Sequence, residues 1–189
     1  MTGSVRAALL AIASAALHAG EPADLEEAVA GHVAALKEML LRSQLSDGSW
    51  SEMDYPVGLT ALAVLALHHA GAAADDPAVL GGISFILPRM ERRTYSESLA
   101  ICALEAVDPV KYRERIWKAV RFLVGSQDGS GGWSYNEVGG GFDNSNTQFA
   151  VLGLAIGRDH GIPIPKDVFS EIARQFGSSV RRGKAEAEV

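Results

Sequence analysis

The feature that most constrains the fold of this chain is a segment that occurs twice. The first copy, residues 44–67, reads QLSDGSWSEMDYPVGLTALAVLAL, and the second, residues 127–154, reads QDGSGGWSYNEVGGGFDNSNTQFAVLGL. In each copy a Gln lies six residues before a Trp, and a Thr later begins an apolar run. Four extra residues in the second copy bring Thr60 onto Thr147. Self-similarity of this kind predicts a repeat architecture, in which one supersecondary unit stacks on the next.

Apolar residues recur at helical spacing throughout the chain, and no segment has the alternation of a strand. The predicted helices cover residues 23–44, 57–70, 78–87, 95–107, 110–126, 146–158 and 165–176. The first and fifth are amphipathic, whereas the second and fourth are apolar on nearly all sides. AICAL at 100–104 also aligns with AVLAL at 63–67, which makes a third copy of the apolar helix. The alternation predicts an all-α fold with two layers, an outer layer half wetted and an inner layer largely buried.

Gln44, Trp50, Gln127 and Trp133 are predicted to have structural roles. The glycines between each Gln and Trp permit the positive φ angles of a tight reversal. A flat Trp ring beside the turn can cover helix ends, and a Gln side chain can bond their unpaired backbone groups.

Composition excludes several classes of function. The chain has 189 residues and a formal charge of -6 with scattered charges, so it lacks the basic surface of a nucleic-acid-binding protein. Cys102 is the only cysteine, which rules out an internal disulfide and a multi-Cys zinc site. We expect it to be a small buried residue. Neighbouring His68 and His69 diverge on a helix, so no metal site and no cofactor is predicted.

The N-terminus has the order of a secretory signal peptide over residues 1–19. Arg6 precedes an eleven-residue apolar run at 7–17, small residues follow, and Glu21 begins an acidic stretch. The run is too short to cross a bilayer. The signal predicts export to the periplasm or medium; the alternative is an Ala-rich helix that begins the fold of a cytoplasmic protein. Sequencing the N-terminus of exported protein distinguishes the two. The repeat domain is placed at 21–176, followed by a polar tail at 177–189.

The two segments QLSDGSW at 44–50 and QDGSGGW at 127–133 resemble the QW repeats of squalene-hopene cyclases, oxidosqualene cyclases and protein prenyltransferases. The likeness covers about residues 28–176. It is closest to exported bacterial prenyltransferase/squalene-oxidase-repeat proteins, in which the phrase DNSNTQFAVLGL at 143–154 is typical. The resemblance implies an α/α toroid of concentric helix pairs. Seven helices do not close such a ring, and no further Trp turn follows Phe176. We therefore expect an open arc, a fragment of a longer protein or one half of an assembly. An uncapped end exposes apolar surface, so we also expect self-association or marginal solubility.

The resemblance also locates a candidate site. In class II terpene cyclases an Asp-x-Asp-Asp-Thr segment supplies a general acid from its middle Asp. Residues 143–147 here read DNSNT, so Asp143 and Thr147 match while Ser145 replaces the acid. A serine cannot protonate an alkene, and the Asp-x-Cys zinc pair of prenyltransferases is missing as well. Asp143 and Glu97 remain as candidate carboxylates facing one mouth. The simpler interpretation is that Asp143 caps its helix and that Glu97 is a solvated first-turn residue.

Asn146, Tyr95 and Tyr135 are candidate binding residues near the same mouth. Three functions stay open at this point. The first is a non-catalytic repeat module that binds a protein partner or an apolar ligand in its concave face. The second is a terpenoid cyclase of squalene-hopene type with a degenerate acid motif. The third is a polysaccharide enzyme on the same scaffold, since paired carboxylates also serve sugar chemistry.

Overall fold

The computed structural model of the chain describes residues 22–51, 54–135, 143–174 and 177. Its helices are α2 (Pro22–Ser43), α3 (Pro56–His69), α4 (Pro77–Ile86), α5 (Thr94–Val107), α6 (Arg113–Gly125) and α7 (Asn144–Asp159). A further helical segment covers residues 166–174. The all-α class is confirmed for these residues, and each helix lies within a few residues of its predicted range. The expected signal at 1–19 and the expected tail at 177–189, apart from its first residue, lie outside the described residues.

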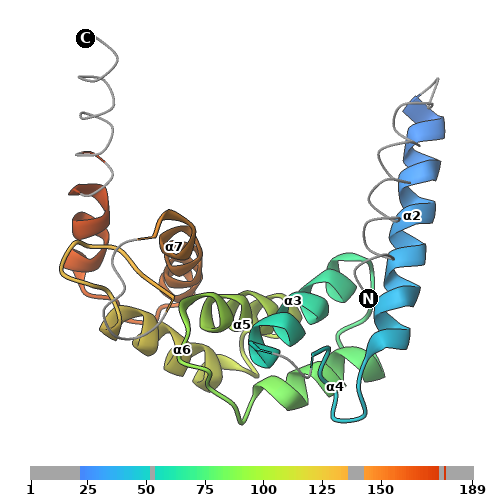
Figure 1. Cartoon of the computed structure of the whole chain (residues 1–189), viewed down its shortest axis with the longest axis horizontal. Coiled ribbons are helices and arrows are strands. Elements are labelled where there is room, and N and C mark those ends of the chain that lie inside the picture. The colour runs from blue at the N-terminus through green and yellow to red at the C-terminus, as the bar shows by residue number, and fades with distance from the viewer. Residues whose placement is uncertain (1–21, 52–53, 136–142, 175–176, 178–189) are drawn as a thin grey trace.

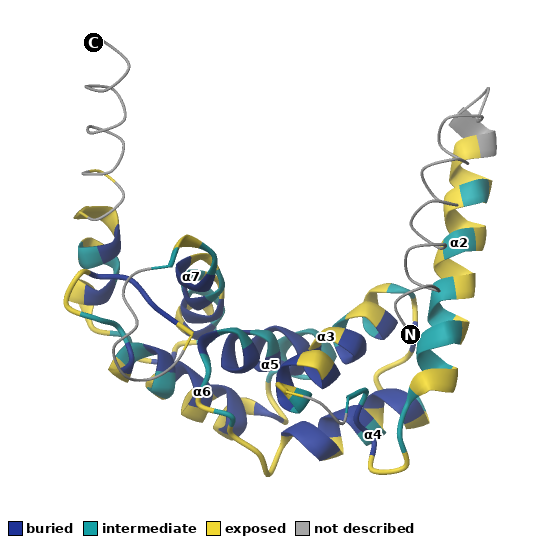
Figure 2. Ribbon diagram, in the orientation of Figure 1, coloured by how far each residue is buried: buried dark blue, intermediate teal, exposed yellow. Residues whose placement is uncertain are grey.

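The helices form two layers of an open arc, which Figure 1 shows. The inner layer consists of α3, α5 and α7, with α5 packed between the other two. The outer helices α4 and α6 pack against α3 and α5 respectively, and α6 also contacts α7. Helix α2 stands at one end of the arc and touches mainly α3. The core lies between the layers, where burial is greatest along α5 (Figure 2).

The prediction that α3 is buried on most sides is wrong for one edge of the helix. Leu59 and Leu62 are 44% and 48% exposed. In the register that pairs Thr60 with Thr147, Leu62 corresponds to Phe149 and Ala66 to Gly153. Those residues of α7 face α5, because Phe149 contacts Tyr95 and Gly153 lies against the side chain of Ile101. No inner helix precedes α3 in the described part of the chain, so the matching edge of α3 is open.

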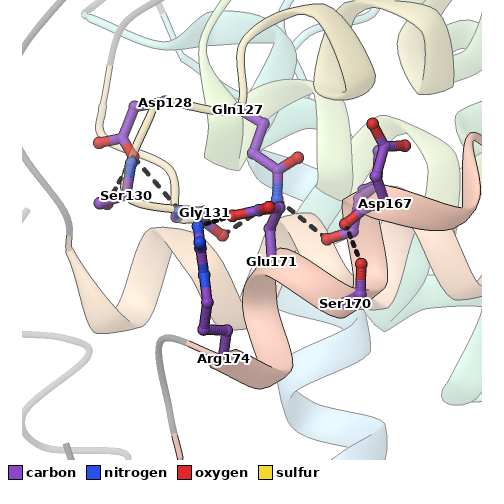
Figure 3. Close-up of polar contacts among 10 residues, drawn as sticks. Gln127, Asp128, Ser130, Gly131, Asp167, Ser170, Glu171 and Arg174 are labelled. Carbon is purple, nitrogen blue, oxygen red and sulfur yellow. Dashed lines mark hydrogen bonds and ion pairs between the residues drawn. The ribbon is translucent and has the colours of Figure 1, made fainter. Parts of the chain in front are cut away.

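The two Gln turns are built alike, atom for atom. Gln44 Nε2 donates to the carbonyl oxygens of Gly48, at 3.0 Å, and Ala78, at 2.9 Å. Gln127 Nε2 donates to the carbonyl oxygens of Gly131 and Val168, both at 3.0 Å (Figure 3). In both repeats the amide therefore ties its own turn to the start of the next outer helix. The partners of both glutamines are thus the turn and the following helix, and not the helix-end groups that the sequence suggested.

The two tryptophans also match. Trp50 Nε1 donates to the carbonyl of Leu40, and Trp133 Nε1 to that of Leu123, each at 2.8 Å. These carbonyls lie near the C-terminal ends of α2 and α6, where helices leave backbone acceptors unpaired. The backbone N–H groups of Trp50 and Trp133 donate to Thr60 Oγ1 and Thr147 Oγ1 at 3.3 and 3.1 Å. Each Trp thus joins the end of an outer helix to the first turns of an inner one.

Glycine is required in both turns by angle and by space. Gly48 and Gly131 have φ values of 88° and 89°, which non-Gly residues rarely adopt. A Cβ on Gly48 would lie 2.4 Å from the carbonyl oxygen of Gly81, and one on Gly131 would lie 2.7 Å from that of Glu171. The adjoining Gly82 faces Trp50 and Val64, where a Cβ would approach within 2.9 and 2.4 Å. Gly81 and Gly82, which lie inside α4, therefore allow the Gln44 turn to pack closely against that helix.

Replacing Trp133 with alanine should lower the free energy of unfolding by about 3 to 5 kcal/mol, as truncation of a buried Trp does. The ring is 0% exposed and its N–H group holds a buried carbonyl. Trp133→Phe keeps most of the volume and should lose less. Trp50 is half-buried, so Trp50→Ala is a milder matched change. Denaturant titration measures all three, and an unmoved midpoint for Trp133→Ala would contradict the structural role.

Candidate functional site

Asp143 is the N-cap of α7. Its Oδ1 accepts hydrogen bonds from the Asn146 backbone N–H at 2.8 Å, the Ser145 hydroxyl at 2.6 Å and Asn146 Nδ2 at 3.0 Å. The Ser145 hydroxyl and then the two groups of Asn146 hold the pKa of Asp143 below its ordinary value of 3.8. The capping role predicted for Asp143 is confirmed. A carboxyl that acts as a general acid at neutral pH needs a raised pKa, whereas the pKa of Asp143 is lowered.

Ser145 occupies the position at which the resemblance would place a catalytic acid. Its hydroxyl donates to Asp143 and is half-buried. The side chain therefore completes the cap of the helix. Its aliphatic hydroxyl has no proton to supply at neutral pH.

Glu97 is not the solvated first-turn residue that the sequence suggested. Its side chain is 0% exposed and forms an ion pair with Arg115, itself 5% exposed, with 2.9 Å between Oε2 and Nη1. Oε1 accepts the backbone N–H of Glu91 at 2.9 Å, and Arg115 Nη2 donates to the carbonyl of Arg89 at 2.8 Å. The pair fastens α5 to α6 and to the connection before α5. A charged carboxylate can be buried at tolerable cost only when its charge is paired, and Arg115 supplies that pairing for Glu97.

The repeat explains why a carboxylate lies there. Aligning 100–104 with 63–67 places Glu97 at the position of Thr60 and Thr147. In the other two repeats the Thr hydroxyl accepts the Trp N–H, and here Glu97 accepts the N–H of Glu91. The connection before α5 has no Trp, and an ion pair holds it in place. The repeat register indicates a hydrogen-bonding role for residue 97. Because no Trp turn precedes α5, the sequence did not show which group it would bond.

Asp143 and Glu97 are held by different elements. Asp143 is committed to the first turn of α7, whereas Glu97 points toward α6, and among the described residues no hydrogen bond or ion pair joins them. Glu91 adds to the second network, because its Oε1 accepts the backbone N–H of Val57 at 2.6 Å. These contacts make the carboxylates parts of the framework.

The predicted aromatic residues do gather. The ring centroid of Tyr95 lies 4.6 Å from that of Phe149 and 6.0 Å from that of Tyr135. Asn146 is fully buried in the first turn of α7, where its Nδ2 donates to Asp143. Phe149 was not among the sequence candidates. The repeat register matches it to Leu62, and that match could have identified it from the sequence.

Tyr95 also identifies the inner face of the arc. Successive helical residues are about 100° apart, so Tyr95 points about 160° away from Glu97, which faces α6. With Leu99, Cys102 and Ala106 it forms one stripe along α5. The repeat register places two matching stripes on the neighbouring inner helices. They contain Leu62, Leu65 and His69 on α3 and Phe149, Leu152 and Ile156 on α7. Apart from the Tyr95 hydroxyl and His69, the residues of these three stripes are apolar.

Cys102 lies in this stripe as a nearly buried thiol, 7% exposed, as predicted. Burial, with the nearby charge of Glu105, raises its pKa from 9.0 to about 11, so the reactive thiolate is scarce at neutral pH. The described residues contain no cluster of three His, Cys, Asp or Glu side chains that could hold a metal. None of the helices described is long and apolar enough to span a membrane.

Comparison with protein-family models, with curated proteins and with solved structures finds no significant match to this chain.

Glu97→Gln should lower the free energy of unfolding by about 3 to 5 kcal/mol, because it leaves the buried charge of Arg115 unpaired. Replacing both residues with methionine should recover much of that loss, because no buried charge remains. Glu114→Gln is the matched control, since its ion pair with Lys118 is exposed and its loss should change little. Denaturant titration of the three variants is the measurement. Equal midpoints for the Gln variants would contradict the role assigned to Glu97.

Asp143→Asn should destabilise the protein at neutral pH and make little difference in strong acid. A depressed folded-state pKa gives stability that is fully present above the ordinary value of 3.8 and is lost as pH falls through the lower folded value. The difference in melting temperature between wild type and Asp143→Asn should therefore narrow below pH 3.8. Calorimetric scans across this range test it, and a gap that widens in acid would refute the cap.

Proposed function

We propose that the chain is a non-catalytic repeat module of the prenyltransferase and squalene-cyclase-like kind. It binds an apolar ligand or a protein partner on the concave side of its arc. The observation that supports this most is the apolar stripe on each inner helix. Leu62, beside the open edge of α3, and Leu152 on α7 are 48% and 47% exposed. Exposed apolar surface of this kind is typical of binding sites.

The chemistry of the carboxylates supports the same proposal. Asp143 is held ionised by its cap, Ser145 donates its hydroxyl to that cap, and Glu97 is paired inside the protein. A cyclase of squalene-hopene type would need a protonated acid, and no observation favours that alternative. Paired carboxylates for sugar hydrolysis would need two free groups, which these two residues do not provide. We also propose that the protein is exported, as the signal-like sequence of residues 1–19 suggests.

Binding on the concave side can be measured with 8-anilino-1-naphthalenesulfonate, a dye that fluoresces on apolar surfaces. Leu62→Glu and Leu152→Glu should each weaken dye binding several-fold. Leu80→Glu on outer helix α4 is the matched control, since Leu80 is also an exposed leucine and its change should leave dye binding unaltered. Equal loss in all three variants would place the dye elsewhere and contradict the concave site.

Catalysis is tested in parallel by incubation with squalene and with isoprenoid diphosphates. Both should be recovered unchanged from wild type and from Asp143→Asn. A cyclised product that disappears in Asp143→Asn would instead establish the cyclase alternative.

We also propose self-association through the open end of the arc. Val29 and Val33 on α2 are 48% and 40% exposed, and Leu59 on α3 is 44% exposed. By the Gln-to-Gln register, Val33 corresponds to Ile116 of α6, which is 1% exposed against the inner layer. Light scattering should therefore show a mass that rises with concentration, and Val33→Lys with Leu59→Lys should keep the chain monomeric.

A further inference from the structure

The convex side of the arc carries a groove along α6 that the proposed function does not use. It consists of three hollows of about 340, 440 and 530 Å³. The first two share Lys118, and the second and third share Arg121 and Gly125, so the hollows follow one another along the helix. Their walls come from α6 and from the connections after α4 and α7. We call this surface the α6 groove.

Trp117 lies in the middle hollow and is 41% exposed. The guanidinium of Arg121 lies 5.1 Å from the centre of its ring, and Met90 and Phe122 line the same hollow. The other two tryptophans of the chain are held in the repeat turns, but Trp117 has no such duty. Trp and Arg side by side on a surface are the residues that contribute most to protein interfaces.

The groove is basic, although the chain as a whole has a formal charge of -6. Arg92, Lys111, Lys118 and Arg121 line it, together with Arg115, whose charge is committed to Glu97. Glu114 is the only acidic residue among the lining residues. Glu114 pairs with Lys118 at 2.7 Å, but both side chains are more than half exposed. Such a surface pair contributes little, so a carboxylate from outside can replace Glu114 at small cost.

We propose that the α6 groove binds a short extended segment of a protein partner in which acidic and apolar side chains alternate. The 13 residues of α6 span about 20 Å, the length of about six extended residues. Side chains alternate in direction along such a segment. Apolar groups enter the hollows beside Trp117 and between Val124 and Ile164, and carboxylates meet the cations on the rim.

The lining favours a peptide over other anionic partners. Glu114 is the one carboxylate and no amide side chain lines the groove, whereas sugar hydroxyls need side chains that accept hydrogen bonds. Leu87, Met90, Val124, Ile164 and two prolines supply aliphatic walls that suit apolar side chains. A bilayer surface does not enter separate hollows, and four cations are too few to follow a nucleic-acid backbone.

The test is selection of a displayed library of random peptides on the full chain, followed by fluorescence anisotropy with the selected sequences. The selected peptides should be enriched in alternating acidic and apolar residues, and rising salt should weaken their binding. Trp117→Ala and Arg121→Glu should each reduce affinity at least tenfold. Arg42→Glu, which reverses an exposed charge on distant α2, is the matched control and should leave affinity unchanged.

Several results would overturn the proposal. Selected peptides without acidic enrichment would do so, as would affinities that Trp117→Ala and Arg121→Glu leave unchanged. Hyaluronate or anionic lipid vesicles that bind in a Trp117-dependent way, while no peptide is selected, would assign the groove to another class of partner. Circular dichroism verifies that each variant folds, and all three substitutions are at exposed positions. The groove and the concave face share no residue, so failure of one assignment leaves the other standing.

Discussion

The arc depends on how the chain closes the end of an outer helix inside the protein. A helix leaves its last carbonyls without partners, and a reversal into the next layer would bury them unsatisfied. The Trp indole donates to a carbonyl in the last turn of the outer helix, and the Gln amide donates to a carbonyl of the turn that follows. The same Gln also bonds the beginning of the following outer helix. The Trp therefore holds the end of one outer helix and the Gln ties the turn to the next, which is why the two residues recur together where the arc advances.

The unit that begins at α5 reaches the same geometry by other chemistry. It has no Gln turn and no Trp, and the ion pair of Glu97 with Arg115 joins the inner helix to the outer one. A buried pair costs desolvation that its attraction barely repays, so its value lies in specificity. An unpaired Glu97 or Arg115 would be costly, which excludes shifted packings of α5 on α6. The two kinds of junction differ in chemistry, and each joins an inner helix to an outer one.

Much of this fold could be predicted from the sequence, because the repeat and the helical periodicity act locally. The helix ranges, the pairing of Gln44 with Gln127 and of Trp50 with Trp133, and the cap at Asp143 all follow from neighbouring residues. Glu97 could not be placed in that way, since its partner Arg115 is distant in sequence and belongs to another helix. The open edge of α3 was missed for a related reason. An apolar helix indicates burial, but it does not say whether a neighbour is present on each side.

The candidate site shows how structural duty limits chemistry. A carboxyl can act as an acid at neutral pH only where desolvation raises its pKa and no donor stabilises its ionised form. At the beginning of α7 the opposite holds, because three donors converge on one oxygen of Asp143. An aspartate in place of Ser145 would remove one donor and place a second negative charge two residues from Asp143. That repulsion is what raises a pKa in paired carboxylates. With serine at position 145, the hydroxyl stabilises the ionised form of Asp143 and completes the cap of α7.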